Sequence, residues 1–295
     1  MPEGLILKGI GGFYEVEGDT GLYACRTRGI FRKRGITPLP GDNVHFTITN
    51  ETLREGWIEE IKERRNCFIR PPVANIKQAA VVMAGASPEP DYLLVDKLLV
   101  SALQNDIQPI IIINKTDLLD AESLQHMEAI YAQTGFPVIL MNKITMQGYD
   151  DLHDKLCGSC TVFAGQSGVG KSTILNMVMD EWVMETNTVS EKIQRGRHTT
   201  RHVQLLPLDC RGYVVDTPGF SSFSLEGLKH DELAWYYPEF EKVQGNCRFH
   251  GCSHINEPGC AVKNAVEANE ISPKRYECYK KLYEELKESY EQRYR

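Results

Sequence analysis

The sequence predicts a multidomain α/β protein built from three successive segments, residues 1–70, 71–222 and 223–295. Three observations support this division. Short alternating apolar runs fill the first segment, longer apolar runs alternate with helical stretches in the second, and the third holds a Cys/His-rich loop before a final helix. A chain of 295 residues is long enough for two or three domains, each with its own core.

The first segment has the pattern of an all-β domain. Its apolar or alternating runs are separated by Gly, Pro, Asp and Asn, and lie at 5–10, 12–17, 21–28, 43–49 and 57–62. Val44, Phe46 and Ile48 alternate with polar residues, which is typical of a half-buried strand. Five short strands fit a small closed barrel such as an OB-fold, although the pattern alone does not exclude an SH3-like barrel.

The second segment begins after Pro71 and Pro72, where the pattern changes to α/β. Apolar runs alternate with helical stretches, at 79–84, 109–113, 137–141, 161–164 and 213–215. This alternation predicts a doubly wound, mostly parallel sheet. The run 110–113 is continuously apolar, so we expect a strand buried on both faces.

The third segment contains few apolar runs and ends in a helix. Ser272 followed by Pro273 is typical of a helix start, with Ser as N-cap and Pro at the first helical position. One face of this helix should be buried, because apolar side chains recur at intervals of three or four, at Tyr276, Tyr279, Tyr283, Leu286 and Tyr290.

Composition indicates an ordinary globular protein, with 42% hydrophobic and 25% charged residues. We find no apolar run of about 18 residues and no secretory signal, so we expect a cytoplasmic location without membrane association. The nine cysteines should then be thiols, metal ligands or core residues rather than disulfides. The net charge of −7 argues against general nucleic-acid binding, but residues 1–70 carry eleven basic against ten acidic side chains.

A phosphate-binding loop is predicted at 165–173, where GQSGVGKST comes after an apolar run and precedes a helical stretch. Its residues are Gly165, Gln166, Ser167, Gly168, Val169, Gly170, Lys171, Ser172 and Thr173. The glycines let backbone N–H groups point at phosphate oxygens, and the helix N-terminus adds its positive dipole end. Lys171 would reach the β- and γ-phosphates, and the Ser172 hydroxyl would bind Mg²⁺.

The motif NKTD favours guanine as the base. Asn114, Lys115, Thr116 and Asp117 come after the apolar run, at the carboxyl end of a predicted strand, where doubly wound sheets bind ligands. The Asp117 carboxylate can accept two hydrogen bonds from the ring N–H and the exocyclic amine of guanine, which adenine lacks on that edge. Asn114 would brace the loop, and the stem of Lys115 would lie over the base.

Two further motifs fit the switch elements of a nucleotide hydrolase. In DTPG, at 216–219, Asp216 would hold Mg²⁺ and the Gly219 N–H would bind the γ-phosphate. In GRHTT, at 196–200, Thr199 or Thr200 would supply a second Mg²⁺ hydroxyl, unless the segment is simply a solvated basic loop.

Phe220 occupies the position where many GTPases carry a water-orienting glutamine. We therefore expect slow hydrolysis that needs another group or a partner. His198 is the first candidate for that catalytic group, beside Lys171, and His202 is the second.

The order of these motifs is circularly permuted, because NKTD precedes both the phosphate loop and DTPG. A barrel, a permuted GTPase and a Cys/His segment in one chain resemble the YjeQ/YloQ (RsgA) family over essentially the whole length. The resemblance implies an OB-fold, a permuted P-loop GTPase and a zinc-bearing helical C-terminal domain. It also implies late maturation of the small ribosomal subunit, with GTP, GDP and rRNA as partners and hydrolysis stimulated by that subunit. One departure is Leu140-Met141-Asn142-Lys143, where the family usually has a Ser-Ala-type contact to guanine.

The spacing C-x₄-C-x-H-x₅-C predicts one structural zinc ion, bound by Cys247, Cys252, His254 and Cys260. His250 is an alternative fourth ligand, and the resemblance favours His254. In a stretch with few apolar residues, metal binding would supply folding free energy. The spacing Cys157-x₂-Cys160 could indicate a redox pair, but we interpret it as incidental, and Cys210 as a structural residue.

Candidate RNA contacts lie on the barrel and near the C-terminus. The aromatic candidates are Phe31, Trp57 and Phe68, each of which could equally be a core residue, and the basic candidates are Arg248, Lys274 and Arg275. Two other functions remain open: a metabolic enzyme that uses GTP as phosphoryl donor, and a GTP-regulated RNA-binding scaffold. Nothing in the sequence requires more than a monomer.

Overall fold

The computed structural model describes residues 1–69, 71–185, 203–216, 225 and 227–293. The described chain divides into two units. Met1–Gln78, His153–Phe163 and Leu175–Phe220 form the first, and Ala79–Leu152, Ala164–Ile174 and Ser221–Arg295 form the second. Among the described residues, no helix combines the length and apolarity needed to span a bilayer.

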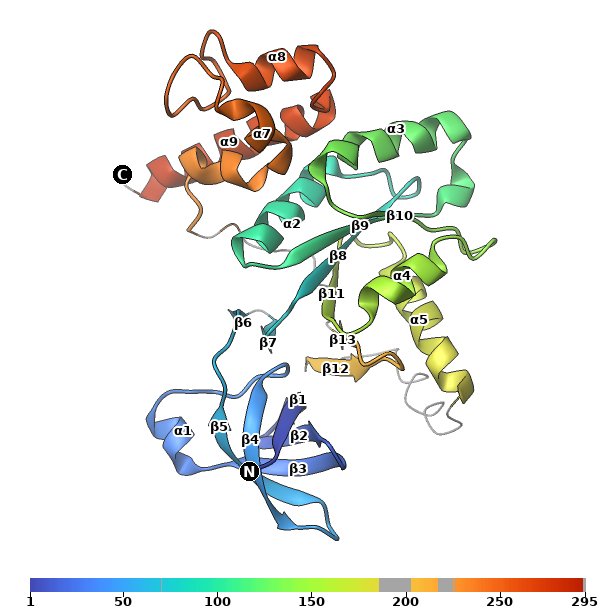
Figure 1. The fold of residues 1–295 in the computed structure, drawn as a ribbon, viewed down its shortest axis with the longest axis vertical. Coiled ribbons are helices and arrows are strands. Elements are labelled where there is room, and N and C mark those ends of the chain that lie inside the picture. Colours follow the sequence, from blue (N-terminus) through green and yellow to red (C-terminus); the bar gives the residue numbers. More distant parts are fainter. Residues whose placement is uncertain (70, 186–202, 217–224, 226, 294–295) are drawn as a thin grey trace. The chain divides into compact units, whose positions relative to one another are not determined.

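Five strands in the first unit close into a barrel (Figure 1). They are β1 (Glu3–Ile10), β2 (Phe13–Gly18), β3 (Gly21–Thr27), β4 (Asn43–Asn50) and β5 (Glu55–Ile61). β1 pairs with β2 and β4, β2 with β3, and β5 with both β3 and β4, so no barrel edge stays open. Only the β3–β5 pairing among these is parallel. The expected OB-type barrel is therefore confirmed.

The barrel core is made by the inward-facing residues of these strands. Alternation along each strand sends every second side chain inward. The buried members are Ile6, Val16, Tyr23, Cys25, Val44, Phe46 and Ile58, and Phe31 from the short helix α1 (Gly29–Lys33) joins them. Phe31 is 7% exposed, so this aromatic belongs to the core and is not a surface stacking platform.

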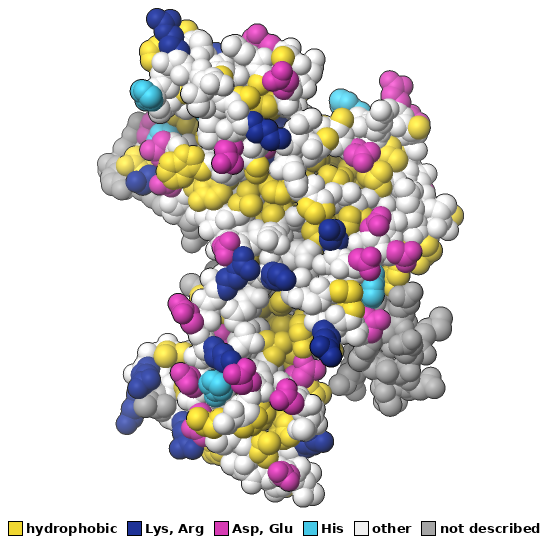
Figure 2. Space-filling model, in the orientation of Figure 1, with side chains coloured by type: hydrophobic (Ala, Val, Ile, Leu, Met, Phe, Trp, Pro, Cys, Tyr) yellow, Lys and Arg dark blue, Asp and Glu magenta, His cyan; other side chains and the backbone are white. Residues whose placement is uncertain are grey.

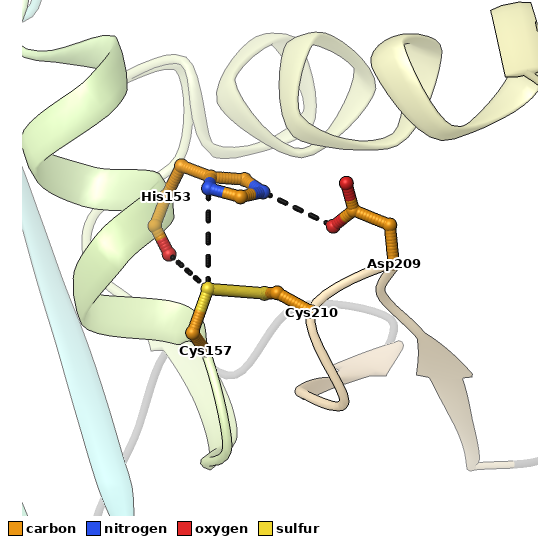
Figure 3. Close-up of a disulfide and its surroundings, with 4 residues drawn as sticks. All are labelled: His153, Cys157, Asp209 and Cys210. Carbon is orange, nitrogen blue, oxygen red and sulfur yellow. Dashed lines mark hydrogen bonds and ion pairs between the residues drawn. A yellow bond between two sulfur atoms is a disulfide. The ribbon is translucent and has the colours of Figure 1, made fainter.

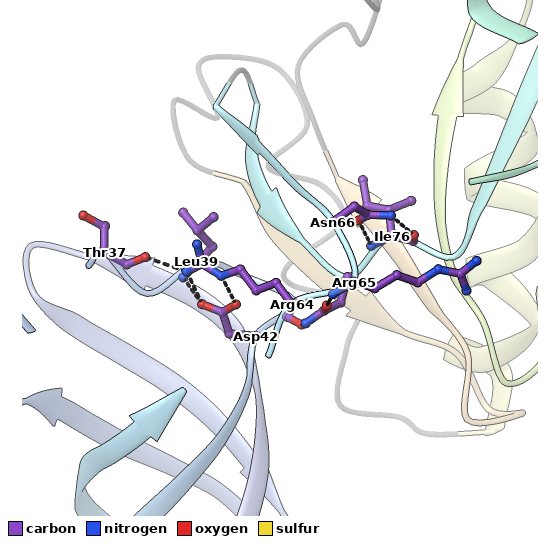
Figure 4. A network of polar contacts seen from close by, with 9 residues as sticks. Thr37, Leu39, Asp42, Arg64, Arg65, Asn66 and Ile76 are labelled. Atoms are coloured by element: carbon purple, nitrogen blue, oxygen red, sulfur yellow. Dashed lines mark hydrogen bonds and ion pairs between the residues drawn. The ribbon is translucent and has the colours of Figure 1, made fainter. Parts of the chain in front are cut away.

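A polar network fixes the chain where it leaves the barrel (Figure 4). The Arg64 guanidinium donates to both carboxylate oxygens of Asp42, at 2.7 and 2.8 Å, and Asp42 is fully buried. Asn66 exchanges two hydrogen bonds with the backbone of Ile76, at 2.8 and 2.9 Å. Because charge-assisted bidentate pairs are directional, this network orients the hairpin of β6 (Cys67–Ile69) and β7 (Pro72–Ala74).

Three further strands belong to the first unit, β11 (Cys160–Ala164, apart from its last residue), β12 (Gln204–Pro207) and β13 (Tyr213–Asp216). β11 and β13 are parallel, whereas β12 is antiparallel to β13 and pairs with β1 at Lys8 and Gln204. The sequence patterns had not indicated β12, β6, β7 or α1.

The second unit contains the strands β8 (Gln78–Ala84, apart from its first residue), β9 (Gln108–Asn114) and β10 (Val138–Leu140), in the order β10-β9-β8. β9 and β10 are parallel, and Ile110 to Ile113 are at most 2% exposed, which confirms a strand buried on both faces. Asp91 caps helix α2 (Tyr92–Gln104) by accepting a hydrogen bond from the Leu94 N–H. Helices α3 (Ala121–Tyr131) and α4 (Tyr149–Leu156) complete the alternation.

The C-terminal helices of this unit share a core with α2. They are η3 (His230–Tyr236), α7 (Pro238–Gln244), α8 (Ala261–Glu267) and α9 (Pro273–Arg293). Val100 of α2 packs in one buried cluster with Leu233, Phe240 and Tyr279. The predicted start of the last helix at Pro273 is confirmed. Tyr276, Tyr279, Tyr283 and Leu286 pack on this cluster as expected, whereas Tyr290 is 39% exposed, so its predicted burial is wrong.

A buried charge network ties the same helices together. The Arg275 guanidinium of α9 lies 2.5 Å from a carboxylate oxygen of Asp96 in α2 and 2.8 Å from one of Glu239 in α7. Arg275 is 1% exposed, so its assignment as a candidate RNA contact is wrong. The residues next to Arg275 in the sequence did not indicate its burial, because both carboxylates that pair with it come from other helices.

One cysteine pair corrects the expectation of no disulfides. Cys157, just after α4, and Cys210, between β12 and β13, form a disulfide with Cα atoms 5.0 Å apart. Cys160 is a free thiol, so the Cys157-x₂-Cys160 spacing is incidental, as expected. A pairing across 53 residues depends on the fold and not on local spacing.

Candidate nucleotide-binding site and metal centre

The predicted phosphate loop joins β11 to helix α5 (Lys171–Glu185). Gly165 and Gly170 have φ of +144° and +99°, a region that other residues rarely adopt. A Cβ at Gly165 would lie 2.1 Å from the Val82 carbonyl oxygen, and one at Gly170 would lie 2.3 Å from the Asn114 amide nitrogen. The loop can therefore keep this curvature only with glycine at both positions.

Lys171 folds back over this loop. Its ammonium donates to the carbonyl oxygens of Gly165, at 2.7 Å, and Gln166, at 2.8 Å. Burial lowers the pKa of Lys171. Ser172 and Thr173 are exposed in the first turn of α5, whereas Val169 is buried.

The NKTD motif lies directly against the phosphate loop. Asn114 ends β9, and its side-chain amide donates to the Val169 carbonyl at 2.8 Å. Lys115 is left-handed, with φ 60° and ψ 38°, and its ammonium donates to the carbonyl oxygens of Gly168, at 2.8 Å, and Ser87. The structure thus brings together two motifs that are far apart in the chain.

Asp117 comes after Thr116 in the short helix η1 (Thr116–Leu118). Its Oδ1 atom is buried and has no hydrogen-bond partner among the residues that the structure describes. A buried acceptor without a partner is unfavourable, so this atom is suited to a donor brought by a ligand. The Thr116 N–H and hydroxyl both donate to the Met141 carbonyl, which places the 140–143 loop beside the motif.

Asp216 ends β13 in the first unit. Burial raises the pKa of its carboxyl, while the Gln204 amide, 3.4 Å away, and the charge of Lys8 act in the opposite direction. The remaining predicted switch and catalytic residues lie outside the described ranges, namely His198, Thr199, Thr200, His202, Gly219 and Phe220.

Four predicted metal ligands converge in the C-terminal segment, and they are Cys247, Cys252, His254 and Cys260. Their donor atoms all lie within 4.8 Å of one another. His254 Nδ1 is 3.6 Å from the Cys247 sulfur and 3.4 Å from the Cys260 sulfur. His254 is 3% exposed, and burial lowers its pKa, which favours the neutral imidazole that a metal requires. His250 is exposed and stands outside the cluster.

The loop that carries the predicted metal ligands is stabilised by groups that the sequence patterns had not indicated. The Glu257 carboxylate accepts hydrogen bonds from the Ser253 hydroxyl at 2.6 Å and from backbone N–H groups of the loop. The Tyr276 and Tyr279 hydroxyls donate to the carbonyls of His254 and Ser253, both at 2.7 Å. The tyrosine spacing had indicated only an apolar face, although a buried Tyr hydroxyl usually needs an acceptor.

Basic residues on the barrel are partly neutralised by acidic neighbours. Arg28 pairs with Glu59 at 2.6 Å, and Lys62 pairs with Glu3 at 2.5 Å. Figure 2 shows this mixture of positive and negative side chains over the barrel. Of the other candidates, Trp57 in the barrel strand β5 and Phe68 in β6 are half-buried. Outside the barrel, Arg248 is exposed and Lys274 pairs with Glu277 at 3.1 Å.

Comparison with known proteins gives consistent matches over the whole chain. Residues 3–58 match the model of the RsgA N-terminal domain, and residues 61–226 match that of the RsgA GTPase. A small ribosomal subunit biogenesis GTPase RsgA of Ruminiclostridium cellulolyticum is 49% identical over 98% of this chain and 95% of its own. The corresponding protein of Geobacillus thermodenitrificans is 45% identical over 98% of both chains.

Two solved structures are similar to this chain over nearly its whole length. The crystal structure of YjeQ from Thermotoga maritima has a TM-score of 0.82 and 36% identity, and covers 97% of this chain and 98% of its own. The crystal structure of YloQ, described as a circularly permuted GTPase, has a TM-score of 0.82 and 38% identity, and covers 98% of this chain and 96% of its own.

Proposed function

Because this chain belongs to the RsgA family of GTPases, we propose that it acts as a GTP-controlled switch in late maturation of the small ribosomal subunit. It is a GTPase, with motifs in permuted order. We assign rRNA binding to residues 1–70, nucleotide binding and hydrolysis to 71–222, and a zinc-bearing segment to 223–295.

The proposed recognition of GTP is supported most directly by the contact between the NKTD motif and the phosphate loop. The side chains of Asn114 and Lys115 donate hydrogen bonds to the carbonyl oxygens of Val169 and Gly168. These bonds fix the distance between the NKTD motif and the phosphate loop. The buried Asp117 oxygen would accept the guanine N–H groups. Lys171 would exchange its two loop carbonyls for β- and γ-phosphate oxygens, to which a cation binds more strongly.

The Ser172 hydroxyl and the Asp216 carboxylate would hold Mg²⁺ beside the phosphates, together with the hydroxyl of either Thr199 or Thr200. The ion would supply positive charge to the β- and γ-phosphate oxygens. Gly219 would sense the γ-phosphate through its backbone N–H. The Cys247, Cys252, His254 and Cys260 donor set suits one structural Zn²⁺, because four protein ligands leave no position for catalysis.

His198 is our candidate for the group that replaces the missing glutamine. We expect His198→Ala to bind GTP normally but to lose most of the hydrolysis that a ribosomal partner stimulates. Single-turnover GTP hydrolysis with and without small subunits measures this. Unchanged stimulated hydrolysis in the variant would contradict the assignment, and the His202→Ala variant would then be tested in the same way.

The ribosomal part of the proposal is supported by relatives that match this chain over nearly its whole length and are small ribosomal subunit biogenesis GTPases. Such a partner would place the protein in the cytoplasm, and a monomer would suffice. Co-sedimentation with purified small or large subunits, with GDP or a non-hydrolysable GTP analogue, tests it. We expect the protein to pellet with the small subunit in the presence of one of these two nucleotides. Equal pelleting with both subunits, or with neither, would contradict the proposal.

A further inference from the structure

A second cluster of possible metal ligands lies outside both sites described above (Figure 3). His153 lies in the last turns of α4 and Cys157 just after that helix, whereas Asp209 and Cys210 lie in the turn between β12 and β13. All four belong to the same unit. The established activity has no evident use for any of them.

The donor atoms in this cluster are close enough to share one ion. One nitrogen of His153 and the sulfurs of Cys157 and Cys210 lie within 4.8 Å of one another. His153 Nδ1 is 3.9 Å from the Cys157 sulfur, compared with 3.4 and 3.6 Å for the nitrogen–sulfur distances in the C-terminal cluster. All three residues are half-buried, so solvent can supply a further ligand.

Asp209 gives the histidine a defined orientation. Its Oδ1 lies 3.1 Å from His153 Nε2, and because a carboxylate only accepts hydrogen bonds, Nε2 carries the hydrogen of this bond. In the neutral imidazole that would bind a metal, the lone pair is then on Nδ1, which faces the Cys157 sulfur (Figure 3). Metal-bound histidines typically show this arrangement, with a carboxylate fixing the tautomer from the second nitrogen. A disulfide that only cross-links the chain does not require it.

The backbone around the cluster is fixed before any ion binds. The Gly158 N–H donates to the Cys210 carbonyl at 3.3 Å, and the Tyr213 N–H donates to the Ser159 carbonyl at 2.8 Å. The turn also approaches α4 closely, because a Cβ at Gly212 would lie 2.3 Å from the Leu156 carbonyl oxygen. Metal sites held on such paired elements need little reorganisation.

We propose that His153, Cys157 and Cys210 form a second metal site, which binds a Zn²⁺-like divalent cation when the two cysteines are reduced. Thiolate and imidazole ligands are those that Zn²⁺ prefers, and three protein ligands leave one position for water. The disulfide is the oxidised, metal-free form of the same site.

The two forms interconvert by thiol–disulfide exchange with a low-molecular-weight disulfide such as oxidised glutathione. The two cysteine thiolates lose two electrons and form one S–S bond. The external disulfide takes up these electrons, its own S–S bond breaks, and it leaves as two thiolates. The cation is released without any change in its charge.

The test is zinc stoichiometry of the full-length protein after reduction with a phosphine and equilibration with ZnCl₂ under nitrogen. We expect two bound ions in the reduced wild type, one from each cluster, and one ion after treatment with oxidised glutathione. His153→Ala should keep both thiols and its disulfide but bind one ion. His126→Ala, which changes an exposed histidine on α3, is the matched control and should bind two.

Asp209→Asn separates metal binding from simple cross-linking. It leaves every proposed ligand in place, and we expect zinc affinity at this site to fall about 10- to 100-fold, with the disulfide still forming. Competition with a chromophoric chelator measures the affinity. One bound ion in both reduced wild type and His153→Ala would overturn the proposal and leave a plain disulfide. Unchanged affinity in Asp209→Asn would overturn the orienting role of the carboxylate.

Discussion

Asp117 is the residue on which we expect the choice of base to depend. Its buried Oδ1 has no partner among the described residues, and the neighbouring Asn114 and Lys115 are both committed to the phosphate loop. Oδ1 therefore keeps its hydrogen-bonding capacity for a ligand, while the neighbouring residues fix the backbone that carries it.

We predict that Asp117→Asn lowers GTP affinity by roughly 100-fold, because one of the two hydrogen bonds is lost and the other loses its charged acceptor. The new amide would place a donor opposite the exocyclic amine of guanine. Xanthosine triphosphate carries a carbonyl there, so we expect the variant to bind it better than GTP. Fluorescent nucleotide titrations measure both affinities, and an unchanged preference for GTP would remove Asp117 from the base site.

Functional residues could be predicted from the sequence where a motif is made of residues close together in the chain. Contacts between residues far apart in the chain could not be predicted. The phosphate loop, NKTD and the C-terminal cysteines are each contiguous or nearly so, and the structure places them in the expected contexts. The Cys157–Cys210 bond and the burial of Arg275 were missed, because the partners of each are separated by long stretches of chain.

The C-terminal helices illustrate how few apolar residues can still hold a segment together. Their core contains Phe240, Tyr279 and the proposed metal ligand Cys260 in one cluster. Because this proposed ligand belongs to the core, metal binding and packing should be coupled.

We predict that removing the metal with a chelator lowers the melting temperature of the C-terminal segment by at least about 5 °C. Added zinc should restore it. Cys252→Ser should melt like the chelated protein, whereas Cys67→Ser, which changes an exposed free cysteine, should behave as wild type. Hydrogen exchange of α8 and α9 at increasing temperature measures this melting. A melting temperature that is the same with and without the chelator would contradict a structural role for the metal.

The buried network of Arg275, Asp96 and Glu239 contains two carboxylates for one guanidinium. Burial raises the pKa of Asp96 to about 6, although Arg275 and the Tyr237 hydroxyl oppose the shift. The folded state then binds a proton more tightly than the unfolded chain, whose Asp has a pKa of about 4. The stability that this carboxyl contributes is present below pH 4 and is lost as pH rises through 6.

We therefore predict that the unfolding free energy of the wild type falls by up to about 3 kcal/mol relative to Asp96→Asn between pH 4 and pH 7. Asp231→Asn, at an exposed position of η3, should behave like the wild type. Urea unfolding at several pH values gives these differences. Parallel pH profiles for wild type and Asp96→Asn would show that the Asp96 carboxyl does not titrate in this range.

Elements were predicted from sequence when their periodicity extended over enough residues. The five barrel strands and the buried β9 gave clear patterns. Strands β6 and β7, of three residues each, and β12, of four, gave none. β6 and β7 pair with each other in a short hairpin, and β12 depends on pairing with β13 and with the distant β1.

At the scale of the whole molecule, permutation changes which segment is joined to each motif. The chain after Asp216 continues into η3 and the C-terminal helices, and Arg275 connects α9 to α2 within the unit that holds NKTD. We therefore expect a change at the γ-phosphate to be transmitted to the C-terminal segment through the chain itself.

The rate of GTP hydrolysis by the purified protein, alone and with isolated small or large ribosomal subunits, tests the central claim most directly. Lys171→Ala is the inactive control. We predict slow hydrolysis alone, strong stimulation by the small subunit and none by the large subunit. Equal rates with and without either subunit, in protein that binds GTP normally, would contradict the proposed role as a switch controlled by the small ribosomal subunit.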